Sequence, residues 1–316
     1  MNPNKMRAIA IQQFGGVEEL QLRSLPIPTP NAGEVLIQIV ASGINPVDVL
    51  LREGFASGSK PKFPIIMGVD LSGIVISVGS GVSELKPGDA VYAHKRGNGT
   101  YAEYAVLPAE WVAHKPTTLK HTQAAAVPCV ALTAYQALTE VLQLQAGETI
   151  LITGGAGGVG SMAVQIAVNL NAHVIATASS RNHSFLKELG VSEVIDYNTT
   201  DFVKAVRSRH PNRVDAVFTT LGSETKYRSI KAVKDGGRLV WISSEEPKGP
   251  TTERGIKGTM FYARADAKSL DNISALINAG KLKPFIEDVL ALEQAKEAQQ
   301  RVASGRVRGK LVLEVT

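Results

Sequence analysis

The stretch that decides the fold is Ile150–Val168, which reads ILITGGAGGVGSMAVQIAV. It opens on a short, continuously apolar run with β-branched side chains, which is typical of a buried strand. From Ser161 onward, apolar residues recur at helical spacing, which predicts a helix. The turn between them is rich in glycine, and Gly155, Gly157 and Gly160 have the spacing G-x-G-x-x-G. Between a strand and a helix, this spacing predicts a dinucleotide-binding site.

Each glycine of the pattern has its own physical reason. The first permits a tight turn, the second lets the backbone approach a pyrophosphate, and the third lets the helix pack closely against the strand. The N-terminus of the helix adds free N–H groups and the positive end of the helix dipole, both of which attract phosphate. The residues expected to bind the cofactor here are Gly155, Ala156, Gly157, Gly158, Val159 and Gly160.

Strands and helices alternate after Pro116. Short apolar strands are expected at Thr149–Thr153, His173–Thr177, Glu193–Asp196, Ala216–Thr220, Arg238–Ser243 and Thr259–Ala263. Helical patterns are found at Thr122–Val127, Leu132–Leu142, Ser161–Asn169, Ser184–Leu189 and Phe202–Arg209. Apolar strands that alternate with helices predict a parallel sheet covered on both faces. This part of the chain is therefore expected to form the doubly wound dinucleotide-binding fold.

The residues before Pro116 show a different, β-rich pattern. Their short runs are bounded by Gly, Pro or Asn, and strands are expected at Arg7–Phe14, Leu20–Leu25, Glu34–Val40, Gly73–Val78, Ala90–Ala93 and Tyr101–Val106. One helix is predicted to begin at Asn45-Pro46-Val47-Asp48, with Asn as N-cap, Pro at the first helical position and Asp in the first turn. The pattern alone does not assign the helix Lys268–Ala279 or the strand Lys310–Val315 to either part.

The composition is that of a globular protein of about two domains. The chain has 316 residues, of which 44% are hydrophobic and 20% charged. Its net charge of +5 comes from scattered Lys and Arg, which does not favour a nucleic-acid partner. No apolar stretch approaches the length of a membrane span, and the polar N-terminus lacks the apolar core of a secretory signal. The expected location is the cytoplasm, with no membrane partner.

Several short motifs together resemble one family. They are Asn45-Pro46-x-Asp48, Gly68-x-Asp70-x-x-Gly73-x-Val75, Gly88-Asp89-x-Val91, Gly99-x-x-Ala102-Glu103-Tyr104, Gly154–Gly160 and Gly309-Lys310-Leu311-Val312. On these residues the chain resembles the medium-chain dehydrogenase/reductase superfamily, in its zinc-independent quinone reductase and enone reductase branch. The resemblance implies an α/β protein with two domains. A GroES-like β-barrel domain would comprise residues 1–121 and 267–316, and a doubly wound, parallel-sheet Rossmann domain would comprise residues 122–266. It also suggests a homodimer joined through the uncharged strand Thr259–Ala263, because exposed edge strands of this character pair with another chain.

The zinc ligands of the related alcohol dehydrogenases are missing. That branch has a Cys shortly before the first helix and a Gly-His-Glu, where this chain has Gly43, Ile44 and Gly68-Val69-Asp70. The only cysteine, Cys129, is distant in sequence from both places, so neither a three-ligand catalytic site nor a four-ligand structural site is expected. His94 is interpreted as a lone surface or core histidine that binds no metal. We therefore expect the protein to bind no metal ion.

The residues after the second predicted strand favour NADP(H). Sites that prefer NAD place an acid about 20 residues beyond the glycines, whereas here Ser179, Ser180 and Arg181 follow the strand. Hydroxyls and a guanidinium bind a 2′-phosphate that a carboxylate would repel. The alternative interpretation is a helix N-cap at Ser180 with a solvated Arg181. By resemblance, the remaining cofactor-binding positions are Thr133, Tyr197, Leu221 and Ser243.

The expected reaction is hydride transfer to a small electrophile, either a quinone or an α,β-unsaturated carbonyl compound. The cofactor performs the difficult step, so the protein needs only to position the reactants and to stabilise charge on oxygen. Asn45 is the catalytic candidate, because the resemblance places it at the substrate and its amide can donate to that oxygen. A pure N-cap role for Asn45 is equally compatible with the sequence. The alternative function is an NADPH-binding protein with little or no turnover.

Overall fold

The computed structural model describes residues 4–55, 61–242 and 254–316, and it divides the chain into two compact units. Unit 1 comprises Met1–Leu132 and Arg264–Thr316, and unit 2 comprises Thr133–Ala263. From the sequence we expected the dinucleotide-binding segment to begin at residue 122. In the structure, residues 122–132 lie in unit 1, where helix α2 (His121–Ala125) packs against its strands β3 (Glu34–Ile44) and β5 (Asp70–Val78).

Unit 1 contains two sheets. A three-stranded sheet has the order β2-β1-β4, formed by β1 (Lys5–Ile11), β2 (Gln21–Pro26) and β4 (Ile65–Ile66). A seven-stranded sheet has the order β15-β16-β3-β5-β6-β8, and β7 also pairs with β3. Its further strands are β6 (Ala90–His94), β7 (Tyr104–Pro108), β8 (Val112–His114), β15 (Ile286–Ala291) and β16 (Lys310–Glu314). The unit's helices are α1 (Pro46–Arg52), α2, α8 (Ala267–Asn278) and α9 (Ala295–Ala303).

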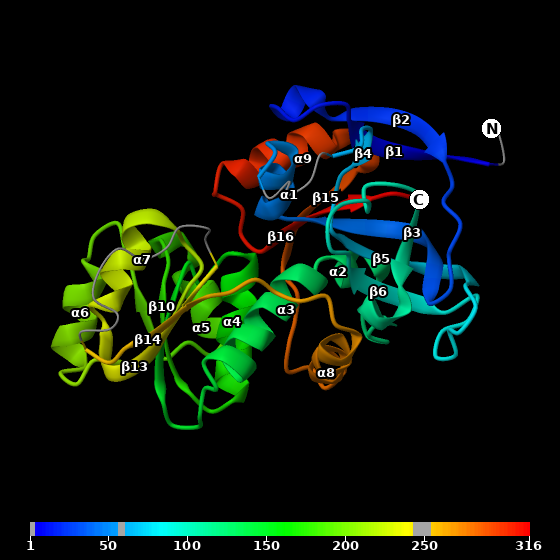
Figure 1. The fold of residues 1–316 in the computed structure, drawn as a ribbon. Coiled ribbons are helices and arrows are strands. Elements are labelled where there is room, and N and C mark those ends of the chain that lie inside the picture. Colours follow the sequence, from blue (N-terminus) through cyan, green and yellow to red (C-terminus); the bar gives the residue numbers. More distant parts are fainter. Residues whose placement is uncertain (1–3, 56–60, 243–253) are drawn as a thin grey trace. The chain divides into compact units, whose positions relative to one another are not determined.

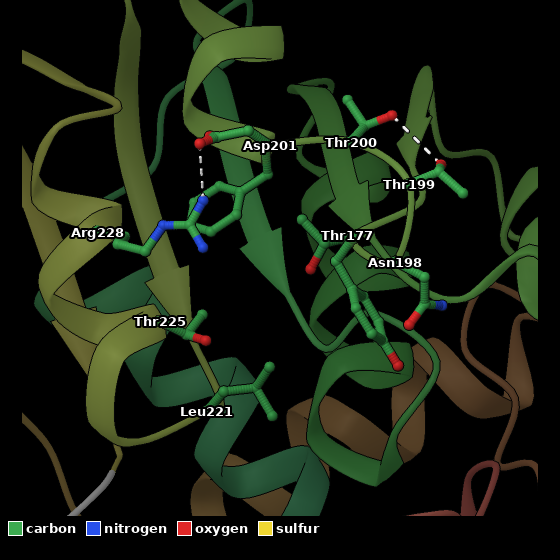
Figure 2. A pocket seen from close by; sticks show the side chains of 10 residues that line it. Thr177, Asn198, Thr199, Thr200, Asp201, Leu221, Thr225 and Arg228 are labelled. Carbon is green, nitrogen blue, oxygen red and sulfur yellow. Dashed lines mark hydrogen bonds and ion pairs between the residues drawn. The ribbon is translucent and has the colours of Figure 1, made fainter.

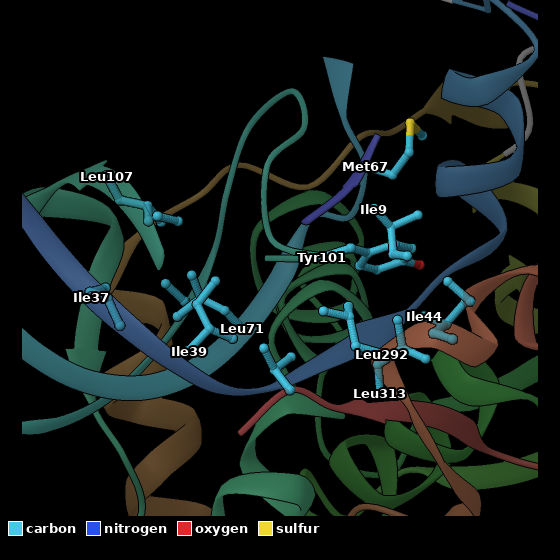
Figure 3. Packing of buried hydrophobic residues seen from close by; sticks show 14 of the residues in the cluster. Ile9, Ile37, Ile39, Ile44, Met67, Leu71, Tyr101, Leu107, Leu292 and Leu313 are labelled. Atoms are coloured by element: carbon cyan, nitrogen blue, oxygen red, sulfur yellow. The ribbon is translucent and has the colours of Figure 1, made fainter. Parts of the chain in front are cut away.

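The C-terminal strand β16 completes the larger sheet. It lies antiparallel beside β3, with Leu311 opposite Ile44, so segments at opposite ends of the sequence lie side by side (Figure 1). Leu311 and Leu313 belong to the same buried apolar cluster as Ile9, Ile37 and Met67. Figure 3 shows Leu313 in this cluster. Residues that the sequence pattern left unassigned are therefore part of the core of unit 1.

Unit 2 contains a six-stranded sheet in which every recorded pairing is parallel. The strand order is β11-β10-β9-β12-β13-β14. The strands are β9 (Thr149–Thr153), β10 (His173–Thr177), β11 (Glu193–Ile195), β12 (Val214–Thr219), β13 (Val233–Trp241) and β14 (Lys257–Met260). The helices are α4 (Gly158–Asn169), α5 (His183–Glu188), α6 (Phe202–Arg209) and α7 (Ser223–Ile230). Helix α3 (Pro128–Gln136) spans the division between the two units.

Strand β9 lies at the point where the strand order of the sheet reverses. Residues 150–153 are all buried, so both faces of the sheet are covered there. The chain crosses from β9 to β10 on one side and later to β12 on the other. In doubly wound folds the ligand crevice lies at this point, beyond the carboxyl ends of the strands. The predicted fold class is confirmed: an α/β protein with a GroES-like part and a parallel-sheet, Rossmann-like part.

Several predicted boundaries are wrong. The last strand, expected at Thr259–Ala263, is Lys257–Met260, because its register with β13 pairs Lys257 with Arg238 and Met260 with Trp241. Strand β13 begins at Val233 rather than at Arg238, since Val233 pairs with Val214 across a bulge. The long helix expected over Leu132–Leu142 is α3 followed by a π-helical segment, Ala137–Val141. Strands β4 and β8 are too short to show a period in the sequence.

Candidate functional site

The glycine-rich turn is attached to the end of the neighbouring strand. The N–H of Gly155 donates to the carbonyl oxygen of Thr177 at 3.0 Å, and the N–H of Gly154 donates to the Thr177 hydroxyl at 3.2 Å. Gly157 is the N-cap of α4, and its own N–H donates to the carbonyl of Gly154. The turn is therefore fixed between β9, β10 and the first turn of α4, whose N–H groups lack partners within the helix.

The space around each glycine tests whether this turn fits a dinucleotide. A Cβ at Gly155 would lie 2.9 Å from the Cβ of Ala176, and one at Gly160 would lie 2.1 Å from the carbonyl oxygen of Gly154. Both glycines are needed for packing inside the turn. A Cβ at Gly157 would lie 3.5 Å from the carbonyl oxygen of Gly154, which is an ordinary van der Waals contact, so packing within the protein does not require glycine at this position. The two tightly packed glycines match the turn and packing roles of the pattern, and the uncrowded Gly157 is compatible with the approach of a phosphate.

A cavity of about 580 Å³ lies in unit 2 at the carboxyl ends of the strands (Figure 2). Its lining includes Thr177 at the end of β10, Tyr197 just beyond β11, and Leu221 just beyond β12. The other lining residues are Asn198, Thr199, Thr200, Asp201, Phe202, Thr225 and Arg228. Arg228 pairs with Asp201 at 3.0 Å and lies over the ring of Phe202. Two of the predicted cofactor residues, Tyr197 and Leu221, thus line one cavity at the expected edge of the sheet.

The predicted phosphate-binding segment follows Thr177 directly. Ser179 is the N-cap of a 3₁₀ turn, Ser180–Asn182, and Arg181 lies within that turn. Ser180 and Arg181 are exposed. Thr133 is buried in α3, and Ser243 lies outside the described residues. The predicted roles of these residues in binding the cofactor stay predictions.

Sequence reasoning missed an acidic residue beside this segment. The carboxylate of Asp196 accepts the N–H of Ser180 at 3.0 Å and that of Asn198 at 2.9 Å. Hydrogen bonds from Asn198 and Ser180 lower the pKa of Asp196. The spacing rule applies to acids that follow β10 along the chain, whereas Asp196 follows the adjacent strand, β11. Strand β11 pairs in parallel with β10, and Thr177 lies opposite Ile195. This register is the signal that would have placed Asp196 beside the segment that follows Thr177.

In unit 1, Asn45 belongs to a buried polar cluster. It is the N-cap of α1, and its side chain is 1% exposed. Its amide nitrogen donates to Asp70 at 2.9 Å and to the carbonyl of Gly43 at 3.4 Å, and its amide oxygen accepts from the Lys310 ammonium at 2.5 Å. Lys310 is itself 3% exposed and lies 3.9 Å from Asp70. The predicted helix start is confirmed, and the prediction that Asn45 is catalytic stays untested.

Asp48 is fully buried in the same cluster. One of its oxygens accepts the N–H of Asn45 and the hydroxyl of Tyr101, each at 2.7 Å. Its other oxygen has no hydrogen-bond partner among the residues that the structure describes. Burial raises the pKa of Asp48 to about 7, although the hydrogen bonds from Tyr101 and Asn45 oppose this rise. The carboxyl group therefore exchanges a proton near neutral pH.

The structure also brings together residues that are distant in sequence. Asp70 accepts the backbone N–H of Cys129 at 2.9 Å and contacts Nδ1 of His94 at 3.0 Å. Possible ligand atoms of Asp70, His94 and Cys129 lie within 4.8 Å of one another. His94 is thus not isolated, and Cys129 is near it in space. Asp70 and Lys310 are both buried, so solvent hardly screens the positive charge beside Asp70, and this charge disfavours a divalent cation there.

The fold and this turn define a class, namely two-unit proteins that bind a dinucleotide. Residues 31–117 match the family described as "Alcohol dehydrogenase GroES-like domain", and residues 189–313 match the one described as "Zinc-binding dehydrogenase". The chain is 33% identical to the 2-methylene-furan-3-one reductase of Solanum lycopersicum, covering 98% of this chain and 79% of that protein. It is also 33% identical to the quinone oxidoreductase of Sus scrofa, with 98% and 97% covered.

A solved structure of the quinone oxidoreductase from Coxiella burnetii superimposes with a TM-score of 0.91 at 33% identity, covering 99% of this chain and 100% of that one. The chain belongs to the medium-chain dehydrogenase/reductase superfamily, in its quinone oxidoreductase branch. This membership makes it an oxidoreductase with a nicotinamide cofactor. Among the described residues, no helix has both the length and the apolar character needed to cross a membrane.

Proposed function

We propose that this protein is an NADPH-dependent reductase that transfers a hydride to quinones or α,β-unsaturated carbonyl compounds. The observation that carries the proposal is the glycine turn of unit 2, whose packing requires Gly155 and Gly160 and which is hydrogen-bonded to Thr177, a residue of the cavity lining. The names of two relatives, a quinone oxidoreductase and a 2-methylene-furan-3-one reductase, support this substrate class.

The cofactor would be held by Gly155–Gly160 and by the residues at the ends of β10, β11 and β12. When bound, it supplies the hydride. The N-terminal N–H groups of α4 would stabilise the charge of the pyrophosphate. Tyr197 and Leu221, which line the cavity, would contact the cofactor from that side. Arg181 would pair with a 2′-phosphate. The carboxylate of Asp196 accepts a hydrogen bond from the backbone N–H of Ser180, next to Arg181. Its negative charge would repel a 2′-phosphate and therefore opposes a preference for NADPH.

Asn45 would stabilise charge on the substrate oxygen. Of its two amide N–H groups, the one that points to Gly43 makes a contact that is 3.4 Å long and weak, so this N–H is the one available to a substrate oxygen. The bond to Asp70 and the bond from Lys310 hold the amide in a single orientation. A quinone or enone spreads the incoming charge, so a neutral donor suffices where an isolated ketone would need stronger stabilisation.

The test is NADPH oxidation with a panel of quinones, enals and saturated alcohols. We expect turnover with the quinones and enals, no oxidation of alcohols, and an unchanged rate in the presence of a chelator. Tight NADPH binding without turnover on the whole panel would support the alternative, a binding protein with little catalysis. Chelator-sensitive alcohol oxidation would contradict the proposal.

We also propose a homodimer that forms through β14. All four residues of this strand are exposed, and β14 is the last strand in the order of its sheet. Edge strands that leave their N–H and C=O groups unpaired associate readily with another strand. Sedimentation at micromolar concentration should therefore give the mass of a dimer. Replacing Thr259 by Pro, which blocks strand pairing, should give a monomer, and a monomeric unaltered protein would refute the proposal.

A further inference from the structure

Two histidines and a glutamate converge at the other end of the sheet in unit 2. His173 is the first residue of β10, Glu193 is the first residue of β11, and His210 follows the last residue of α6. The cavity residues Thr177 and Tyr197 lie at the opposite ends of the same two strands. This cluster is therefore separate from the nucleotide site and has no part in the proposed reaction.

The two imidazole rings contact the same carboxylate oxygen of Glu193. Nε2 of His173 lies 3.1 Å from Oε1 of Glu193, and Nε2 of His210 lies 2.7 Å from the same atom. The possible ligand atoms of all three residues lie within 4.8 Å of one another. Ligands on a tetrahedral ion with bonds of about 2.0–2.1 Å are roughly 3.3 Å apart. The three side chains are therefore close enough together to bind one ion.

Charge and exposure are compatible with an ion at this place. Arg209 contacts the other oxygen of Glu193 at 3.2 Å, which leaves Oε1 to the two imidazoles. The His173 side chain is 42% exposed, and those of Glu193 and His210 are each 21% exposed. An ion can therefore enter from solvent, and water can complete its coordination.

We propose that His173, Glu193 and His210 form a surface site for a divalent transition metal, for which Zn²⁺ is the probe. Two imidazole nitrogens and one carboxylate oxygen suit Zn²⁺ and its neighbours, whereas Ca²⁺ and Mg²⁺ take oxygen ligands. The bound ion joins β10, β11 and α6. It stabilises unit 2 without taking part in hydride transfer, because it binds the folded arrangement of three separate segments.

Zn²⁺ titration by calorimetry tests this site on the full chain, freed of any histidine tag and stripped with a chelator. The unaltered protein should bind one Zn²⁺ per chain more than the double variant His173→Asn/His210→Asn. Glu193→Gln should weaken Zn²⁺ binding roughly tenfold or more. Loss of a residue that only orients a metal ligand lowers the affinity by about this factor, and loss of a ligand itself should lower it at least as much. His114→Asn, at an exposed position of β8 in unit 1, is the matched control and should bind like the unaltered protein.

Co²⁺ spectra distinguish this site from the Asp70, His94 and Cys129 cluster. Nitrogen and oxygen ligands give visible bands alone, whereas a cysteine thiolate adds a strong near-ultraviolet band. Circular dichroism verifies that each variant is folded. If the double variant does not fold, the Zn²⁺ affinity of the single variant Glu193→Gln tests the site instead. Equal Zn²⁺ binding by the unaltered protein and a folded variant, or a thiolate band lost in Cys129→Ser, would overturn the proposal.

Discussion

Replacing Asp48 by Asn should change how the stability of the protein depends on pH. Asp48 is fully buried, and its pKa rises from an ordinary 3.8 to about 7 in the folded protein. Between these two values the folded state holds a proton that the unfolded state has released. The contribution of Asp48 to stability is therefore complete below about pH 4 and is lost as pH rises toward 7. The rise in pKa corresponds to on the order of 4 kcal/mol, because each tenfold change in proton affinity is worth about 1.4 kcal/mol.

Asn resembles the protonated carboxyl and does not titrate, so Asp48→Asn should lack this loss. The assay is denaturant unfolding of both proteins from pH 4 to pH 8. The stability of the variant relative to the unaltered protein should rise with pH, by several kcal/mol at most. Asp201→Asn is the control: hydrogen bonds, first from the Lys204 N–H, lower the pKa of Asp201 below its ordinary 3.8, so its effect on stability should hardly vary between pH 4 and pH 8. If the difference between Asp48→Asn and the unaltered protein does not vary with pH, this reasoning is refuted.

Four further substitutions test the packing of the glycine turn and the proposed cofactor and substrate contacts. Arg181→Ala should raise the KM for NADPH about tenfold to a hundredfold, since a charge-assisted contact is worth about 1.5–3 kcal/mol; an equal effect on NADH would contradict this assignment. Gly160→Ala should cost roughly 1–3 kcal/mol of stability by overpacking, whereas Gly157→Ala should weaken only cofactor binding, as thermal melts and NADPH titrations would show. Asn45→Ala should lower kcat about 10- to 100-fold if its amide meets the substrate oxygen. A loss of stability alone would make Asn45 only a structural residue.

The sequence predicted correctly those elements whose conformation depends on residues adjacent in the chain. The glycine turn and the start of α1 at Pro46 follow from close packing and from the missing N–H of proline, and both are present as expected. The β14 boundary depends on pairing with β13, which no local pattern encodes. Asp196 reaches Ser180 from the next strand, and Cys129 reaches Asp70 across the fold. Long-range contacts of this kind are invisible to motif spacing.

The pairing of β16 with β3 has a consequence for the order in which the protein folds. Unit 2 is one uninterrupted stretch, so it can fold as soon as its own residues have been synthesised. Unit 1 is made of an early and a late segment, and Lys310 and Leu311 come from the late one. Until that segment emerges, Asp70 lacks its buried cation and one edge of β3 is unpaired along residues 41–44. The nascent chain therefore carries an open sheet edge throughout the synthesis of unit 2, and this edge is where a chaperone or a second nascent chain would bind first.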